Sequence, residues 1–164
     1  MFKSYCIALF IVCFITACSE PAQTQIPHGP LAFESNDECH VCGMLITRFP
    51  GPKGQAYDNR DKQSKKFCST VALMSWYLQP ENQANVAEIY VHDMAETHWD
   101  SPIDTRLIPA RNAYFVVGSS KKGSMGKTLA SFATRQQAQD FSKKWQGNVI
   151  TFDDINLELI NSSM

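Results

Sequence analysis

Two thiols, a thioether and an imidazole lie within the six residues CHVCGM, at Cys39, Cys42, Met44 and His40. Two cysteines at this spacing could form a redox dithiol, but a redox pair has no use for the thioether. A structural zinc site would need a second pair of ligands and would not choose a methionine. Cuprous ion prefers thiolate and thioether donors, so a site that combines Cys42 with methionine is a Cu(I) site by ligand type.

Composition and spacing alone leave four interpretations of this stretch open. They are a Cu(I) site, a dithiol or disulfide redox pair, a structural zinc site, and a turn of the core that binds nothing. A redox CxxC usually opens a helix whose dipole lowers the pKa of the thiol. Here Gly43, Ile46 and Thr47 follow the second cysteine. A glycine and two β-branched residues favour a turn that leads into a strand.

A further accessible thioether is predicted far along the chain. The polar stretch SKKGSMGKT, residues 120–128, places Met125 between Gly123 and Gly126. Turns flanked by glycine do not bury a methionine well, so we expect the Met125 side chain to be exposed.

Other residues that could bind a metal have simpler interpretations. Cys68 heads an apolar helix and is expected to be buried as a small hydrophobic residue rather than to act as a ligand. The segment VHDMAETHW offers His92, Met94 and His98, which could present imidazoles to a second metal. A strand end with solvated histidines is favoured instead. His40 is expected at the surface.

The beginning of the chain has the pattern of a secretory signal. Lys3 precedes an apolar run from Tyr5 to Ala17, which is shorter than the roughly 20 residues that span a bilayer. The run ends in ITAC, which resembles the lipobox of bacterial lipoproteins, where cleavage precedes the cysteine and the cysteine takes the lipid. Cys18 is then the lipid attachment site. A plain signal peptide with a chance cysteine at its border is the alternative.

Removal of residues 1–17 leaves a slightly acidic chain. It takes away one of the 15 Lys and Arg residues and none of the 16 Asp and Glu residues. This balance indicates neither a nucleic-acid-binding protein nor a polybasic membrane patch. Residues 18–30 are polar and rich in proline, as expected for a tether. Residues 31–160 suffice for one compact domain.

Two stretches of this domain look alike. The first is KKFCSTVALMSWYL followed by AEIYVHD, and the second is LASFATRQQAQDFSKKW followed by VITFDD. In each, a phenylalanine precedes a hydroxyl N-cap candidate, Ser69 or Thr134, and then a helix. A β-branched run follows each helix. The first helix is apolar on nearly every side, which places Met74 in the core.

Short strands are expected before each helix. They are residues 44–47 and 55–58 in the first half, and 113–117 and 128–132 in the second. Together with the helices and the later strands, they predict an α+β fold with two related ββαβ units. The units comprise about residues 31–95 and 105–160.

The order of these motifs resembles the NosL family, periplasmic copper-chaperone lipoproteins that serve the maturation of nitrous oxide reductase. The resemblance covers the mature domain and is carried by CHVCGM after a lipoprotein signal, then FPGPKGQ, KKFCSTVALMSWYL and GSMGKTLASF. It implies that Cys42 is the thiolate of a copper site and Met125 its distant thioether partner. Met44 is then a third donor or a close neighbour. Cys39 tunes the site, assists it or pairs.

The resemblance also implies a function without catalytic residues. The protein would be a Cu(I) carrier in the periplasm, anchored by lipidated Cys18 to the outer membrane. It would deliver copper to nitrous oxide reductase through the membrane-bound maturation machinery of that enzyme. The alternative is a membrane-anchored thiol-disulfide oxidoreductase that uses Cys39 and Cys42. A scaffold with a structural disulfide is a third possibility.

Overall fold

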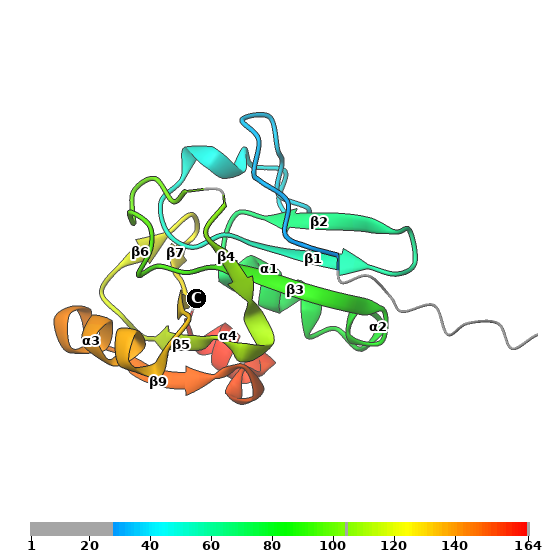
Figure 1. Cartoon of the computed structure of the whole chain (residues 1–164). Helices are drawn as coiled ribbons and strands as arrows, with labels where there is room; N and C mark the ends of the chain where they lie inside the picture. Colours follow the sequence, from blue (N-terminus) through cyan, green and yellow to red (C-terminus); the bar gives the residue numbers. More distant parts are fainter. Residues whose placement is uncertain (1–27, 104, 164) are drawn as a thin grey trace, which may run out of the picture.

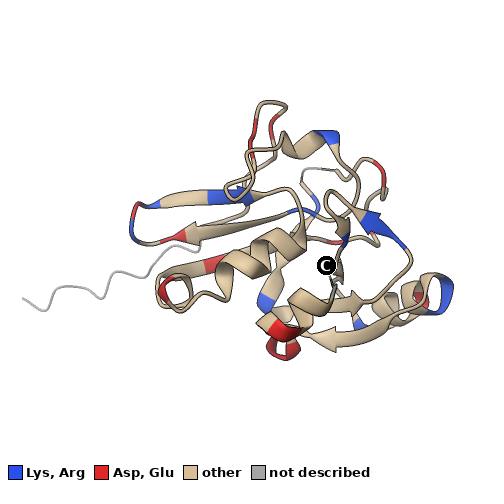
Figure 2. Ribbon diagram, turned by 180° about the vertical axis from the view of Figure 1, so that it is seen from behind, with Lys and Arg blue, Asp and Glu red and all other residues tan. Residues whose placement is uncertain are grey.

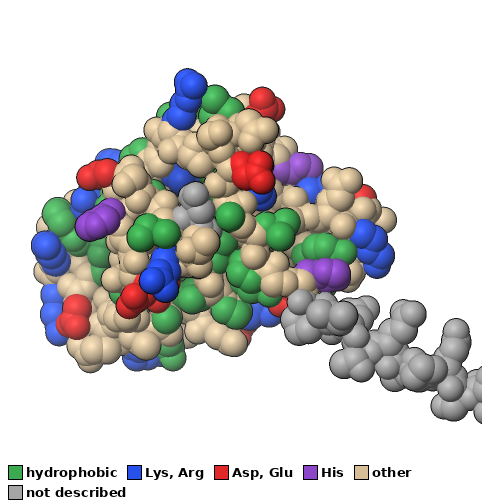
Figure 3. Space-filling view, turned by 45° about the horizontal axis from the view of Figure 1, so that its top comes forward, with side chains coloured by type: hydrophobic (Ala, Val, Ile, Leu, Met, Phe, Trp, Pro, Cys, Tyr) green, Lys and Arg blue, Asp and Glu red, His purple; other side chains and the backbone are tan. Residues whose placement is uncertain are grey.

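The computed structural model describes residues 28–103 and 105–163 (Figure 1). The predicted signal peptide, Cys18 and most of the predicted tether lie outside these residues. None of the described helices has the length and apolar composition that a membrane crossing requires. Basic and acidic residues alternate along strands, helices and loops, without a region of one sign alone in this view (Figure 2). Hydrophobic side chains lie between polar and charged ones on the face drawn in Figure 3.

The first half of the domain forms a four-stranded antiparallel sheet in the order β2-β1-β3-β4. A short 3-10 helix, η1, precedes this sheet at Ile46–Arg48. The elements of this half are β1 (Gly54–Asp58), β2 (Gln63–Phe67), α1 (Thr70–Tyr77), α2 (Pro80–Gln83), β3 (Val86–His92) and β4 (Leu107–Pro109).

The second half forms a three-stranded antiparallel sheet in the order β8-β5-β9 and a separate hairpin of β6 and β7. Its strands are β5 (Tyr114–Val117), β6 (Lys122–Gly123), β7 (Gly126–Lys127), β8 (Ala130–Phe132) and β9 (Asn148–Thr151). Its helices are η2 (Ala110–Asn112), α3 (Arg135–Trp145), η3 (Phe152–Asp154) and α4 (Leu157–Ser163).

The predicted α+β fold with a ββαβ repeat is confirmed by the strand order. In each half the first strand, β1 or β5, is central, and the strands before and after the helix flank it. Both predicted N-caps form, because Ser69 Oγ accepts from the Ala72 N–H at 3.0 Å and Thr134 Oγ1 accepts from the Gln137 N–H at 3.3 Å. These side chains satisfy backbone donors that a helix end leaves unpaired.

The predicted strand at residues 44–47 is wrong. Leu45 makes only an isolated bridge with Glu38, and η1 begins at the next residue. The partner of β1 within the first unit is β2, whose sequence QSKKF is too polar to predict a strand from its pattern. A second difference is the β6–β7 hairpin, which is inserted between β5 and β8 where the first unit has only the turn at residues 59–62.

One hydrophobic core joins the two units. Phe67 and Met74 of the first unit lie in the same buried cluster as Phe115 and Leu129 of the second. The predicted core position of Met74 is confirmed, and α1 is buried on several sides because it packs on β1, β2 and α4. A smaller cluster under α3 includes Phe132. The shared core fixes the start of α1, where the candidate site lies.

Candidate metal centre

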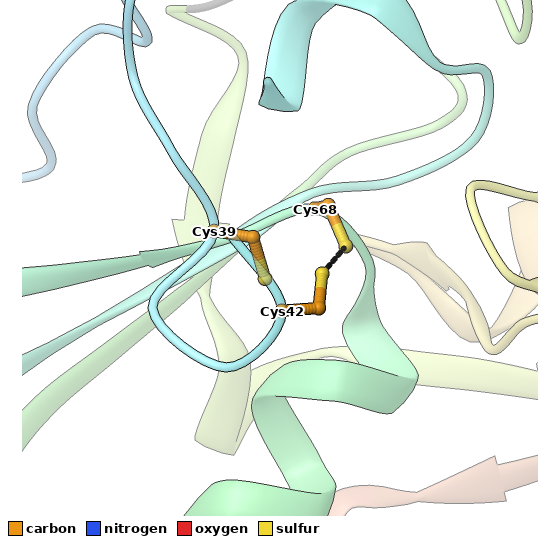
Figure 4. Close-up of side chains that lie close together, drawn as sticks. All are labelled: Cys39, Cys42 and Cys68. Atoms are coloured by element: carbon orange, nitrogen blue, oxygen red, sulfur yellow. Dashed lines mark hydrogen bonds between the residues drawn. The ribbon is translucent and has the colours of Figure 1, made fainter. Parts of the chain in front are cut away.

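Three cysteine sulfurs converge at the start of α1 (Figure 4). The Sγ atoms of Cys39, Cys42 and Cys68 all lie within 4.8 Å of one another, and the Cys42 and Cys68 Sγ atoms are 3.7 Å apart. Cys39 is 3% exposed and Cys68 0%, whereas Cys42 is exposed. The cluster therefore has a covered side and an open side. Among the described residues, these cysteines form the one group of three or more His, Cys, Asp or Glu side chains whose ligand atoms lie close enough to hold a metal ion.

A tight loop brings the first two cysteines together. The Gly43 N–H donates to the Cys39 carbonyl at 2.8 Å, and the Cys39 N–H donates to the Met44 carbonyl at 2.9 Å. Gly43 has a φ of +70°, a left-handed conformation that glycine adopts without steric cost. The chain therefore turns back immediately after Cys42, and the two sulfurs of the CxxC face the same space (Figure 4).

The loop is held against the first sheet at His40. Its N–H donates to the Lys66 carbonyl at 2.8 Å, just before Cys68. The His40 ring contacts Phe67 and Trp76 edge-on, at centroid distances of 5.9 and 5.7 Å. His40 is exposed, as predicted. These contacts set the loop beside the β2–α1 junction, which supplies the third sulfur.

The two buried thiols, Cys39 and Cys68, differ in acidity. A hydrogen bond from the Cys68 thiol lowers the pKa of Cys39 to about 4, against the opposing effect of burial. Backbone N–H groups of Cys68, Cys42 and Val41 add to this lowering. The same hydrogen bond to Cys39, together with burial, raises the pKa of Cys68. Of the two buried cysteines, Cys39 is therefore the one that carries the thiolate, a soft anionic donor, at neutral pH.

The two methionines of the predicted site lie on different elements. Met44 is half-buried and ends the CHVCGM loop. Met125 is 57% exposed at the turn between β6 and β7, which confirms the predicted accessibility of this side chain. The neighbouring Ser124 hydroxyl donates to the Cys68 carbonyl, so the turn that carries Met125 contacts the backbone of the third cysteine.

A second contact ties the hairpin to α1. Thr70 Oγ1, in the first residue of α1, donates to the Leu129 carbonyl at 2.7 Å and lies 3.0 Å from Thr128 Oγ1. Thr128 and Leu129 directly follow β7. The structure therefore brings the glycine-flanked turn of the second unit to the cysteine cluster of the first.

The prediction that His92 is solvated is wrong. His92 is 1% exposed, and its Nδ1 accepts a hydrogen bond from the Lys53 N–H at 2.9 Å. Because Nδ1 is the acceptor, the ring proton is on Nε2, which has no hydrogen-bond partner among the described residues. Burial, with a smaller effect of the Lys53 ammonium, lowers the pKa of His92 to about 4.

These facts argue against a second metal in the VHDMAETHW segment. Neither nitrogen of His92 has a free lone pair in this tautomer. Met94 is also buried, whereas His98 is exposed, so the side chains do not share one environment. The solvated position predicted for His98 is confirmed.

Cys68 is the possible ligand that sequence reasoning set aside. Its predicted burial is confirmed, but its sulfur belongs to the cluster. The signal in the sequence was the cysteine count: after Cys18 the chain contains only Cys39, Cys42 and Cys68. A third cysteine in a domain with a CxxC is a reason to consider a three-sulfur site.

Comparison with known proteins places this geometry in a family. The family model described as NosL matches residues 30–160. The chain belongs to the NosL family. The copper-binding lipoprotein NosL of Stutzerimonas stutzeri is 46% identical over 157 residues, which are 96% of this chain and 82% of that protein. Its counterpart from Achromobacter cycloclastes is 32% identical over 144 residues, 86% and 74% of the two chains.

A solved NosL structure has the same fold. The crystal structure of the copper chaperone NosL from Shewanella denitrificans matches with a TM-score of 0.79 and 46% sequence identity. The match covers 80% of this chain and 98% of that one. The resemblance to NosL read from the motifs is therefore confirmed, as is the α+β class.

Proposed function

We propose that this NosL protein is a periplasmic Cu(I) chaperone that supplies copper for the copper centres of nitrous oxide reductase, and that it is not an enzyme. The observation that carries the proposal is the cluster of three cysteine sulfurs within 4.8 Å, open to solvent at Cys42. The names of the relatives from Stutzerimonas stutzeri and Shewanella denitrificans, a copper-binding lipoprotein and a copper chaperone, support it.

The donor types around the cluster suit Cu(I). In our proposal Cys42 is the principal thiolate of the loaded site, the buried Cys39 and Cys68 are sulfur donors behind it, and Met44 and Met125 supply thioethers. Binding of Cu(I) displaces the proton of each thiol that becomes a ligand. Cu(I) accepts two to four such soft donors, so all five need not bind at once. Zinc would accept the three cysteines but rarely takes methionine, so the methionines distinguish the two metals.

The unequal exposure of the sulfurs suggests a direction for transfer. Cys39 and Cys68 are buried, whereas Cys42 and Met125 are exposed. An incoming donor from an acceptor protein approaches on the exposed side and replaces a thioether first. The thiolates, which bind Cu(I) more strongly, leave last. Transfer by ligand exchange needs no general acid or base.

We propose that lipidated Cys18 anchors the protein to the outer membrane, after removal of residues 1–17, and that residues 18–30 are the tether to a domain of residues 31–160. The side chain of Gln55 binds both backbone groups of Leu31, at 3.0 and 2.8 Å, which supports a domain boundary near this residue. In this proposal the partners of the protein are nitrous oxide reductase and the membrane-bound maturation machinery of that enzyme.

A thiol-disulfide oxidoreductase is the second candidate. The lowered pKa of Cys39 and the short distance between the Cys42 and Cys68 sulfurs favour it. However, the acidic thiol is the buried Cys39, which a substrate disulfide cannot reach. The CxxC also leads into an isolated bridge and η1 rather than opening an α-helix.

One experiment separates the two candidates. The processed protein, purified without air, is titrated with Cu(I) against bicinchoninate and is also assayed as a reductant of a mixed glutathione disulfide. We expect it to retain about one Cu(I) and to show no reductase activity. Reductase activity without copper retention would overturn the proposal.

Ligand variants test the donor set. Met125→Ala should weaken Cu(I) binding on the order of 10 to 100-fold, and Cys42→Ser should weaken it more, because the thiolate is the stronger donor. Stability should change by less than about 0.5 kcal/mol in Met125→Ala, because the side chain is exposed. Leu157→Ala, at another exposed apolar position, is the control. Unchanged binding in Met125→Ala would confine the site to the cysteines and Met44.

A further inference from the structure

A buried lysine lies between the CxxC half of the molecule and the hairpin that carries Met125. Lys53 is 2% exposed. Its ammonium donates to the carbonyls of Phe49 and Pro50, at 2.7 and 2.8 Å, and to Ser124 Oγ at 3.2 Å. A lysine is rarely buried so completely unless its charge is bonded in this way.

Ser124 continues the connection to the metal centre. Its hydroxyl accepts from the Lys53 ammonium and donates to the carbonyl of Cys68. A hydroxyl can do both at once, because it has one proton and two lone pairs. Three segments therefore meet at Ser124: the Phe49–Lys53 turn, the β6–β7 turn and the backbone of the third cysteine.

Close packing adds to this attachment. A Cβ atom on Gly51 would lie 2.9 Å from the Cα of Gly123, so the two backbones touch where a side chain would not fit. Gly51 also has a φ of +79°, which favours glycine. Nearby, Trp99 Nε1 donates to the Lys122 carbonyl at 2.8 Å. The hairpin thus rests on the Phe49–Lys53 turn along its β6 strand.

We propose that Lys53 and Ser124 are positioning residues that hold the β6–β7 turn beside the cysteine cluster, so that the adjacent Met125 can reach a Cu(I) ion bound there. The inference rests on the proposed copper function. The reason is geometric: Met125 is exposed and the β6–β7 ladder is only two residue pairs long, so the polar contacts of Ser124 supply much of what fixes the turn.

The three hydrogen bonds of the Lys53 side chain depend on its protonated form. Burial lowers the pKa of Lys53 to about 8. The side chain is therefore mainly an ammonium at neutral pH and can donate to both carbonyls and to Ser124. If Lys53 only satisfied the carbonyls of Phe49 and Pro50 and did not hold the β6–β7 turn, its replacement would leave the position of Met125 unchanged.

The test compares Lys53→Leu, Ser124→Ala and Ser124→Thr with the parent protein. Leucine is apolar, lacks the charge and offers no donor to copper, and threonine retains the hydroxyl. Ser120→Ala is the control, because the Ser120 hydroxyl donates to the Trp145 carbonyl instead. Cu(I) affinity is measured by competition with bicinchoninate, alone and combined with Met125→Ala. Amide hydrogen exchange of residues 122–127 is measured in the metal-free proteins.

We expect Lys53→Leu and Ser124→Ala to speed exchange in the hairpin and to lower Cu(I) affinity about 3 to 30-fold, up to the loss caused by Met125→Ala. In combination with Met125→Ala they should cause little further loss, because they act through the same donor. Ser124→Thr should restore the affinity, and Ser120→Ala should match the parent.

Several results would overturn the inference. If Lys53→Leu and Ser124→Ala bind copper like the parent, these residues do not position a ligand, although the copper function stands. If the loss of Cu(I) binding free energy in each double variant equals the sum of the two single losses, Lys53 and Ser124 act independently of Met125. If the parent retains no copper, the proposed function fails. Amide exchange in the hairpin of the metal-free proteins then still tests the contact, and an unchanged rate in Lys53→Leu would exclude a positioning role.

Discussion

The buried histidine gives the protein a stability that depends on pH in a defined window. The pKa of His92 is about 4 in the folded protein, against 6.5 for the ordinary side chain. Between these two values the unfolded chain binds a proton that the folded protein rejects. Stability is therefore fully present above pH 6.5 and falls as the pH decreases toward 4. The difference of 2.5 between the two pKa values corresponds to about 3 kcal/mol.

The matched variant is His92→Asn. Its side-chain oxygen can accept the hydrogen bond from the Lys53 N–H, as Nδ1 does, but it has no proton to gain in this range. Urea unfolding of the metal-free, reduced proteins is followed by circular dichroism at pH 7.5, 6.5, 5.5 and 4.5. From pH 7.5 to 4.5 the parent should lose about 2 to 3 kcal/mol more than the variant.

The comparison removes the contribution of carboxylates, because both proteins contain the same ones. His98→Asn is a further control: His98 is exposed, and its replacement should leave the pH dependence of the parent unchanged. Equal slopes for the parent and His92→Asn would refute the assignment of a buried, neutral imidazole.

Three further predictions concern other parts of the chain. Met74→Ala should lower the free energy of unfolding by about 2 to 5 kcal/mol in urea melts, because Met74 is fully buried, while the folded fraction still binds copper. Thr134→Ala should cost about 1 kcal/mol in the same assay by removing the N-cap of α3, and an unchanged midpoint would mean that the capping box contributes nothing. Cys18→Ala should yield a protein that is either soluble or still carries its signal after cell fractionation. A processed, membrane-bound product would contradict lipidation at Cys18.

The parts of the fold that were predictable depend on local signals. The N-caps Ser69 and Thr134 and the helices after them are set by residues within a few positions. The ββαβ repeat followed because the same signals occur twice. The exposure of Met125 was predictable in the same way, from the glycines beside it.

The failures concern partners that are distant in sequence. Ile46 and Thr47 favour a strand locally, but no strand within residues 28–103 and 105–163 pairs with them, and a 3-10 helix forms instead. His92 is buried because the backbone of Lys53, 39 residues earlier, provides its partner. The sulfur of Cys68 lies beside the CxxC because β2, which precedes Cys68, is bonded to the loop: the Lys66 carbonyl accepts from the His40 N–H. Periodicity contains no information on such contacts.

The hydrogen bond between Ser124 and the Cys68 carbonyl joins residues 56 positions apart. During synthesis, which proceeds from the N-terminus, all three cysteines appear well before the hairpin that closes against them. The early half also lacks Phe115 and Leu129, which complete the core around α1. A truncated chain therefore contains the thiols without the surroundings that bury two of them and hold them together. The cluster as it stands in the folded protein therefore needs the second half of the chain, so its formation reports complete folding.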